Sequence, residues 1–131
     1  YGHRIGDQAL VTVGGKLMGY GKKYGTTPNR SFFPARFGGE EFVVVMPGIN
    51  LKDAAQDAEN LRAIIEDYNF IIRDYNGQVL EKGIKITVSI GVAELENAWG
   101  DVAGERLLDQ ADKAMYQAKT AGRNRICLAQ A

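Results

Sequence analysis

The chain contains very little cysteine and histidine, and their scarcity excludes two common ways of stabilising a small protein. Cys127 is the only cysteine among the 131 residues, so no disulfide can form within the chain, as suits a reducing compartment. His3 is the only histidine, so no Cys/His cluster is available to bind zinc. A chain of this length can bury a hydrophobic core, and we expect that core to hold one domain together.

Long hydrophobic runs and an excess of charge of either sign are also missing. No apolar run approaches the roughly 18 residues of a membrane-spanning helix, and the opening Tyr1-Gly2-His3-Arg4 does not resemble a signal peptide. The 16 acidic residues balance 16 basic ones, so no overall field attracts nucleic acid or an anionic membrane. Because an initiator methionine is also missing, we expect a piece of a longer cytoplasmic protein, which an upstream membrane or sensor region could tether.

Helical and strand periodicities alternate along the whole chain and predict its fold class. The predicted helices cover residues 7–20, 50–67 and 104–121. The predicted strands cover residues 32–46 and 70–80 as two hairpins, then 84–93 and 125–128. This order predicts an α/β fold, an α+β sandwich in which helices flank a mainly antiparallel central sheet.

A few residues mark where the predicted elements begin, turn and end. Asn50 is predicted to cap the second helix, and Gly122 follows the third helix where a C-cap is expected. Asn76-Gly77 between apolar runs is a strong signal for a tight hairpin turn. Gly91 lies within a predicted strand, at a place where another backbone or a ligand can approach closely.

The segment Arg36-Phe37-Gly38-Gly39-Glu40-Glu41-Phe42 is predicted to form the tip of the first hairpin. Gly38-Gly39 tolerates positive φ at both central positions of a tight turn and lets a ligand approach the backbone. The apolar run 42–46 that follows is short enough to be a strand covered on both faces. Glu40 and Glu41 would then stand together at the tip, either as a functional pair or as charges that keep a loop solvated.

Adjacent carboxylates at a glycine turn suit a divalent metal ion that handles phosphates. Mg²⁺ commonly takes one or two protein carboxylates and completes its shell with phosphate and water oxygens. The positive counterparts could be Lys119 and Arg123, four residues apart beside Gly122, although cations there also complement a helix dipole. Asp7 could accept hydrogen bonds from guanine N1–H and its 2-amino group, or cap the first helix. His3 taken alone is interpreted as structural.

Four segments in the same order resemble the GGDEF family, the diguanylate cyclases, in its glutamate variant. They are Tyr1-Gly2-His3-Arg4-Ile5-Gly6-Asp7, Gly38-Gly39-Glu40-Glu41-Phe42, Thr87-Val88-Ser89-Ile90-Gly91-Val92-Ala93, and residues 111–119 with Gly122-Arg123-Asn124. Because they cover the chain from end to end, the chain is interpreted as one GGDEF domain over residues 1–131, incomplete at its N-terminus.

The resemblance implies a nucleotidyl-cyclase-like fold and condensation of two GTP molecules into cyclic di-GMP, with release of pyrophosphate and with Mg²⁺ or Mn²⁺ as cofactor. Glu40 would be the catalytic carboxylate and a metal ligand, and Glu41 would assist at the metal. The implied substrate-binding residues are His3, Asp7, Gly38, Gly39, Lys119 and Arg123. Each domain would carry one GTP, so two domains must face each other for one 3′-hydroxyl to attack the other α-phosphorus.

Two features depart from the family pattern. The family's first strand, with a metal-binding Asp, would lie upstream of Tyr1, so we expect an upstream sensory or dimerising region and little activity from this chain alone. Many relatives carry an Arg-x-x-Asp product-inhibition motif, which Asn29 and Phe32 replace here, so we expect no inhibition through such a site.

Two other functions compete with the cyclase. One is a non-catalytic interaction domain that responds to GTP or cyclic di-GMP, which the intact acidic positions of the signature disfavour. The other is an antiparallel-sheet RNA binder, which would need exposed aromatics on the sheet and a basic face. Zero net charge and aliphatic strands disfavour RNA binding.

Overall fold

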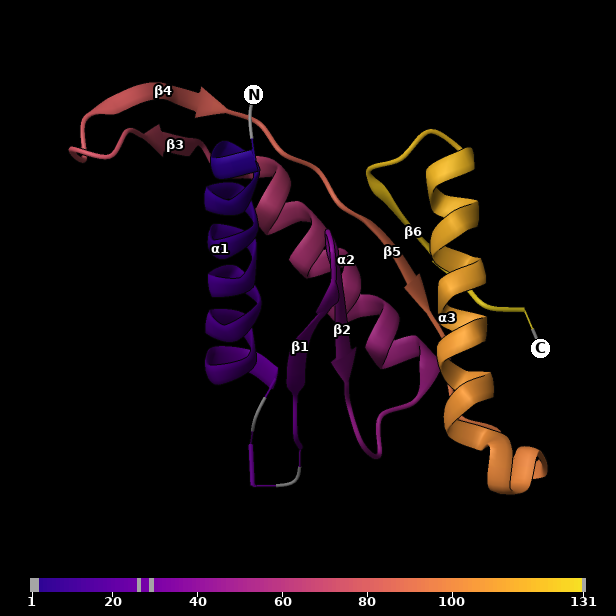
Figure 1. Ribbon diagram of the computed structural model, residues 1–131. Coiled ribbons are helices and arrows are strands. Elements are labelled where there is room, and N and C mark those ends of the chain that lie inside the picture. The colour runs from indigo at the N-terminus through magenta and orange to yellow at the C-terminus, as the bar shows by residue number, and fades with distance from the viewer. Residues whose placement is uncertain (1–2, 26, 29, 131) are drawn as a thin grey trace. The chain divides into compact units, whose positions relative to one another are not determined.

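The computed structural model describes residues 3–25, 27–28 and 30–130 (Figure 1). The chain divides into two compact units, Tyr1–Gly48 with Ile64–Ile86 and Ile49–Ala63 with Thr87–Ala131. The described strands form three pairs, two antiparallel and one parallel, and helices alternate with these pairs along the chain. The predicted mixed α/β class is therefore confirmed.

The first unit contains one long helix and two hairpins. Its elements are α1 (His3–Tyr20), η1 (Gly21–Gly25), β1 (Phe33–Gly38), β2 (Glu41–Val45), the end of α2 (Leu51–Asp67), β3 (Phe70–Arg73) and β4 (Val79–Ile84). Because α1 begins at His3, Asp7 lies inside the helix, and its interpretation as an N-cap is wrong. The helix also runs on into η1, a π-helical turn that extends beyond the predicted helix end at residue 20.

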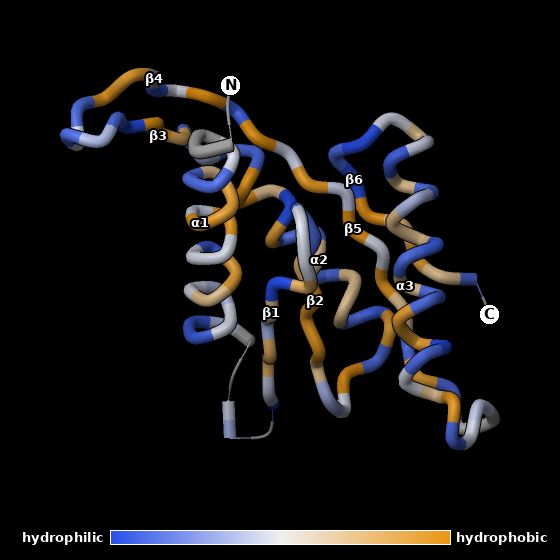
Figure 2. Tube along the Cα trace, in the orientation of Figure 1, coloured by the Kyte–Doolittle hydropathy of each residue, from blue (hydrophilic) through white to orange (hydrophobic). Residues whose placement is uncertain are grey.

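The core of the first unit is formed by one stripe of α1 and by β3. Val13, Leu17 and Tyr20 recur at helical spacing and are buried, and Figure 2 shows hydrophobic positions recurring along this helix. Phe70 and Ile72 alternate inward along β3 and are 1% and 2% exposed. Burying side chains of this size is worth roughly 1.5–3 kcal/mol each, so this stripe holds α1 in place.

Two strand predictions differ from the structure. β2 was expected to be covered on both faces, but Val45 is 51% exposed and the rest of its apolar run is half-buried. Among the described residues β2 pairs only with β1, so no other strand covers its second edge. The single strand predicted over residues 84–93 is also wrong, because β4 ends at Ile84 and residues 85–88 lie outside any ladder.

The second unit combines the start of α2 with a parallel strand pair and a long helix. Its other elements are β5 (Ser89–Val92), η2 (Asn97–Val102), α3 (Ala103–Thr120) and β6 (Arg125–Leu128). The predicted cap of α2 is confirmed, because the Asp53 backbone N–H donates a 2.8 Å hydrogen bond to Asn50 Oδ1. No helix in the described part of the chain has both the length and the apolar character needed to cross a membrane.

Gly91 lets α3 lie directly on β5. A Cβ at this position would stand 2.0 Å from the carbonyl oxygen of Ala111 and 2.3 Å from the backbone nitrogen of Met115. Ala114 and Ala118 continue the same small-residue face and are 1% and 0% exposed. The predicted close approach at Gly91 is thus confirmed, and the neighbour is the backbone of a helix rather than a ligand.

Candidate functional site

The turn that presents the two glutamates lies one residue later than the sequence predicts. Gly38 pairs with Glu41, so Gly39 and Glu40 occupy the two central positions and Phe37 forms a bulge. Gly38 and Gly39 have φ angles of 135° and 52°, so both glycines adopt positive φ as predicted, although only Gly39 is a central turn residue. The bulge and turn together place Glu40 at the outermost point of the hairpin.

Arg36 fixes this turn, a role that no pattern in the sequence predicts. Its Nε and Nη2 atoms both donate to the carbonyl oxygen of Gly39, at 3.2 Å and 2.8 Å. A planar guanidinium holds an acceptor in this forked way, whereas an ammonium group acts as a single point charge. The only signal in the sequence was an arginine standing two residues before the glycine pair.

The carboxylates of Glu40 and Glu41 are exposed, and neither pairs with any other residue that the structure describes. The described residues contain no group of three or more Asp, Glu, His or Cys side chains arranged to hold a metal ion. Two free carboxylates fit Mg²⁺ or Mn²⁺ that arrives with a nucleotide, because phosphate and water oxygens can supply the remaining ligands. They do not form a complete protein cage.

Asp7 and the hairpin tip lie toward the same end of the first unit. Gly14 of α1 contacts the ring of Phe42, since a Cβ at Gly14 would lie 3.4 Å from Cε1. From this contact Asp7 is about 10 Å further toward the helix N-terminus, and Glu40 about 7 Å further along the hairpin. Figure 1 shows the tip directed toward the N-terminal half of α1.

Asp7 is exposed and lines an open hollow of about 430 Å³ between α1 and β3. Gln8 connects α1 to β3 beside this hollow. Its side-chain amide donates to the Arg73 carbonyl at 2.6 Å and accepts from the Arg73 N–H at 2.9 Å. No residue of the hairpin tip lines the hollow. The side chain of His3, with its predicted nucleotide contact, and the replacement at Asn29 lie outside what the structure describes.

The second group of site residues belongs to the second unit, where α3 ends in a Schellman motif. The Arg123 N–H donates to the Ala118 carbonyl at 2.9 Å, and the Gly122 N–H donates to the Lys119 carbonyl at 3.4 Å. Gly122 has a φ angle of 126°, which confirms the predicted glycine stop. Arg123 therefore lies beyond the helix, as expected from the predicted helix end at residue 121, and the side chains of Lys119 and Arg123 are both exposed.

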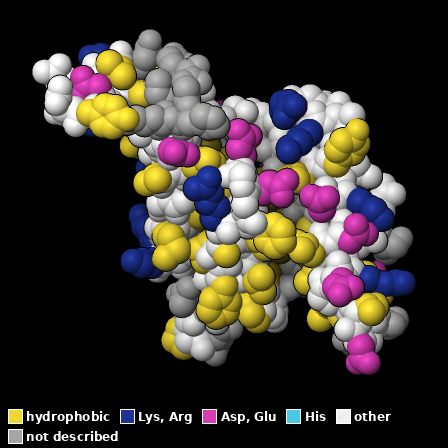
Figure 3. Space-filling view, viewed as in Figure 1, with side chains coloured by type: hydrophobic (Ala, Val, Ile, Leu, Met, Phe, Trp, Pro, Cys, Tyr) yellow, Lys and Arg dark blue, Asp and Glu magenta, His cyan; other side chains and the backbone are white. Residues whose placement is uncertain are grey.

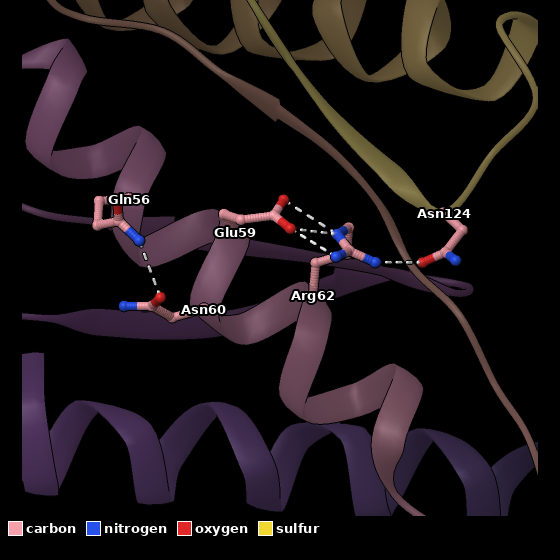
Figure 4. Close-up of polar contacts among 5 residues, drawn as sticks. All are labelled: Gln56, Glu59, Asn60, Arg62 and Asn124. Atoms are coloured by element: carbon pink, nitrogen blue, oxygen red, sulfur yellow. Dashed lines mark hydrogen bonds and ion pairs between the residues drawn. The ribbon is translucent and has the colours of Figure 1, made fainter.

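A polar chain connects α2 to this turn (Figure 4). Arg62 donates from Nε to both carboxylate oxygens of Glu59, at 3.0 Å each, and from Nη1 to Asn124 Oδ1 at 2.9 Å. Hydrogen bonding from Arg62, reinforced by its charge, lowers the pKa of Glu59 below the ordinary value of 4.5 against the opposing effect of desolvation. No local sequence pattern predicts this link, because Arg62 and Asn124 are 62 residues apart along the chain.

The surface chemistry around the hairpin differs from that of an RNA-binding sheet. On the face drawn in Figure 3, acidic and basic side chains are interspersed, and hydrophobic side chains also reach the surface. Phe33 and Phe37 of β1 are 59% and 60% exposed, and Phe33 pairs with Val45 of β2. These exposed aromatics occur on a two-stranded hairpin, and the face drawn in Figure 3 shows no continuous basic surface among the described residues.

Comparison with known proteins identifies what this arrangement resembles. The model of a family described as "Diguanylate cyclase, GGDEF domain" matches residues 1–125. The chain is 39% identical over 126 residues to diguanylate cyclase DgcP of Pseudomonas aeruginosa, covering 96% of this chain and 16% of that protein. It is 36% identical over 126 residues to response regulator PleD of Caulobacter vibrioides, covering 96% of this chain and 25% of that protein.

A solved structure shares the fold over the whole chain. The GGDEF domain of DgcB from Caulobacter crescentus, solved in complex with c-di-GMP, is similar with a TM-score of 0.79 and 30% sequence identity. The match covers 100% of this chain and 66% of that one. The chain thus spans only part of each of these relatives.

Proposed function

Because this chain belongs to the GGDEF domain family, we propose that residues 1–131 act as a diguanylate cyclase domain within a larger cytoplasmic protein. The domain condenses two GTP molecules into cyclic di-GMP and releases pyrophosphate. The observation that carries the proposal is the exposed Glu40 carboxylate, which has no partner among the described residues and stands on a turn fixed by Arg36. A related protein named as a diguanylate cyclase and a similar domain solved with c-di-GMP support it.

Glu40 and Glu41 would hold the metal ion at the hairpin tip, and the metal ion would bind the reacting phosphate. Mg²⁺ or Mn²⁺ bound there would neutralise phosphate charge and lower the pKa of the attacking 3′-hydroxyl. The Glu40 carboxylate is unengaged in the described structure and can accept the proton of that hydroxyl. Gly38 and Gly39 carry no Cβ, so the nucleotide can lie against the backbone of the turn.

The remaining site residues bind the rest of the nucleotide. Lys119 and Arg123 hold the phosphates with charge-assisted hydrogen bonds, since Lys119 is exposed in the last turn of α3 and Arg123 is exposed beyond its end. Asp7 accepts from guanine N1–H and the 2-amino group, and His3 lies near the nucleotide. Each domain binds one GTP, so turnover requires a second GGDEF domain facing the first, brought together by an upstream sensory or dimerising region.

The native polypeptide that contains this chain should be incubated with GTP and Mg²⁺ while cyclic di-GMP and pyrophosphate are measured. Glu40→Gln should lower synthesis by at least about 100-fold, the usual contribution of a positioned acid or base. Glu94→Gln, a matched change at an exposed glutamate of the second unit, should leave it unchanged. Binding of GTP without any synthesis would overturn the proposal in favour of a non-catalytic, nucleotide-responsive interaction domain.

A further inference from the structure

We propose that Arg62 is a positioning residue for the phosphate site, holding Arg123 in place through Asn124. The inference rests on the proposed phosphate role of Arg123 and extends it to a residue on another element. Arg62 belongs to α2, and Asn124 stands between α3 and β6, 62 residues further along the chain. Both residues lie in the second compact unit.

The backbone of Arg123 is in a conformation that needs support. Arg123 and Asn124 have φ angles of 64° and 47°, in the left-handed region that residues other than glycine rarely adopt. Asparagine tolerates this region better than most residues, but arginine has no such preference. Two successive left-handed residues therefore persist only where surrounding contacts hold them.

Three contacts provide that support. The N–H of Arg123 is bonded to the carbonyl of Ala118, and its own carbonyl accepts from Nε of Arg125 at 3.0 Å. The third contact is the 2.9 Å hydrogen bond from Arg62 Nη1 to the side chain of Asn124. With its backbone held on both sides, the exposed side chain of Arg123 is the part left free to meet a ligand.

Arg62 is itself anchored, so it can transmit this support. Its side chain is only 17% exposed, and the carboxylate of Glu59, one turn earlier on α2, accepts hydrogen bonds from its other nitrogens. Figure 4 shows the guanidinium lying between the two partners, with Glu59 on one side and Asn124 on the other. A rigid fork pinned by a carboxylate fixes its remaining nitrogen in space, as a flexible lysine does not.

The same helix offers a control. Gln56 donates to Asn60 Oδ1 at 3.0 Å, also within α2, and Gln56 is exposed. This bond is drawn beside the Arg62 chain in Figure 4 and does not lead to the Arg123 turn. Gln56→Ala therefore removes a polar contact of α2 without touching the proposed path.

The test compares binding of GTP and GMP, in the presence of Mg²⁺, to the native polypeptide that contains this chain. Arg62→Lys and Asn124→Gly should each weaken GTP binding by roughly tenfold, as removal of an orienting partner usually does, and leave GMP binding nearly unchanged. In an Arg123→Ala background, Arg62→Lys should add no further loss, because both changes act through one side chain. Gln56→Ala should change neither affinity.

Several results would overturn the inference. A loss that is equal for GTP and GMP, or that is fully retained in the Arg123→Ala background, would mean that Arg62 only stabilises the fold. Normal GTP binding by Arg62→Lys, where Arg123→Ala is impaired, would refute the positioning role and leave the proposed function intact. Normal GTP binding by Arg123→Ala itself would instead refute the phosphate role on which the inference rests. If Arg62→Lys does not fold, Asn124→Gly provides the same comparison, because glycine accepts the left-handed φ.

Discussion

The guanidinium of Arg36 holds the carbonyl oxygen of Gly39, the residue immediately before Glu40, with two hydrogen bonds of 3.2 Å and 2.8 Å. The contact closes the hairpin turn from within its own strand and restricts the backbone that carries the proposed catalytic carboxylate. Because all of these groups are exposed, the contact contributes to the placement of Glu40 more than to the stability of the fold.

Replacing Arg36 with lysine keeps the charge but removes the fork. We expect Arg36→Lys to lower the rate of cyclic di-GMP synthesis by roughly 10- to 100-fold, since small displacements of a reacting group are costly. The melting temperature should change little. Initial rates and thermal melts measure both, with Arg106→Lys on the exposed surface of α3 as the control. An unchanged rate would show that the turn holds its shape without Arg36.

Asp7→Asn tests the proposed recognition of guanine. A carboxylate accepts from both N1–H and the 2-amino group, whereas an amide presents one acceptor and one donor. We expect GTP affinity to fall by about tenfold or more, and ITP affinity to fall less because hypoxanthine lacks the 2-amino group. Competition binding gives both values, and Asp112→Asn on α3 is the control. Equal losses for GTP and ITP would remove Asp7 from base recognition.

Gly91→Ala tests the packing of α3 on β5. The added methyl would lie far inside contact distance of the Ala111 oxygen and the Met115 nitrogen, and backbone atoms cannot turn aside as side chains do. We expect the free energy of unfolding to drop by about 3 kcal/mol or more, at the upper end for overpacked cores. Urea denaturation measures the change.

The matched control is Gly104→Ala, near the start of the same helix, where an added Cβ meets nothing within 4 Å. That change should raise the free energy of unfolding by up to about 1 kcal/mol, because alanine is the better helix former. If Gly91→Ala were equally harmless, the contact between α3 and β5 would have to be looser than the structure shows.

The Glu59–Arg62 pair should make stability depend on pH in the acid range. Arg62 lowers the pKa of Glu59 in the folded state below 4.5, so the unfolded chain binds this proton more readily. The stabilisation of the folded state by this pair is therefore fully present above about pH 4.5. It is lost as the pH falls through the lowered pKa of Glu59. Melting temperatures of the wild type and Glu59→Gln should differ at pH 6 and converge toward pH 3. A constant difference would contradict the assignment.

Much of the architecture follows from local sequence. The stripe of Val13, Leu17 and Tyr20 predicts α1, because a helix brings such positions to one face wherever it packs. Asn50 and Gly122 predict helix ends, because a side-chain acceptor and a left-handed residue satisfy terminal backbone groups locally. The glycine pair with two glutamates likewise predicts the hairpin tip and its carboxylates.

Tertiary structure decided what depends on residues distant in sequence. How the elements pack decides three features: the register that makes Glu40 a central turn residue, the exposure of Val45 on β2, and the α3 backbone lying against Gly91. The hydrogen bond between Arg62 and Asn124 joins two segments whose local sequence patterns do not predict a contact between them. Periodicity and turn chemistry act over a few residues, whereas these contacts exist only once folding has brought remote segments together.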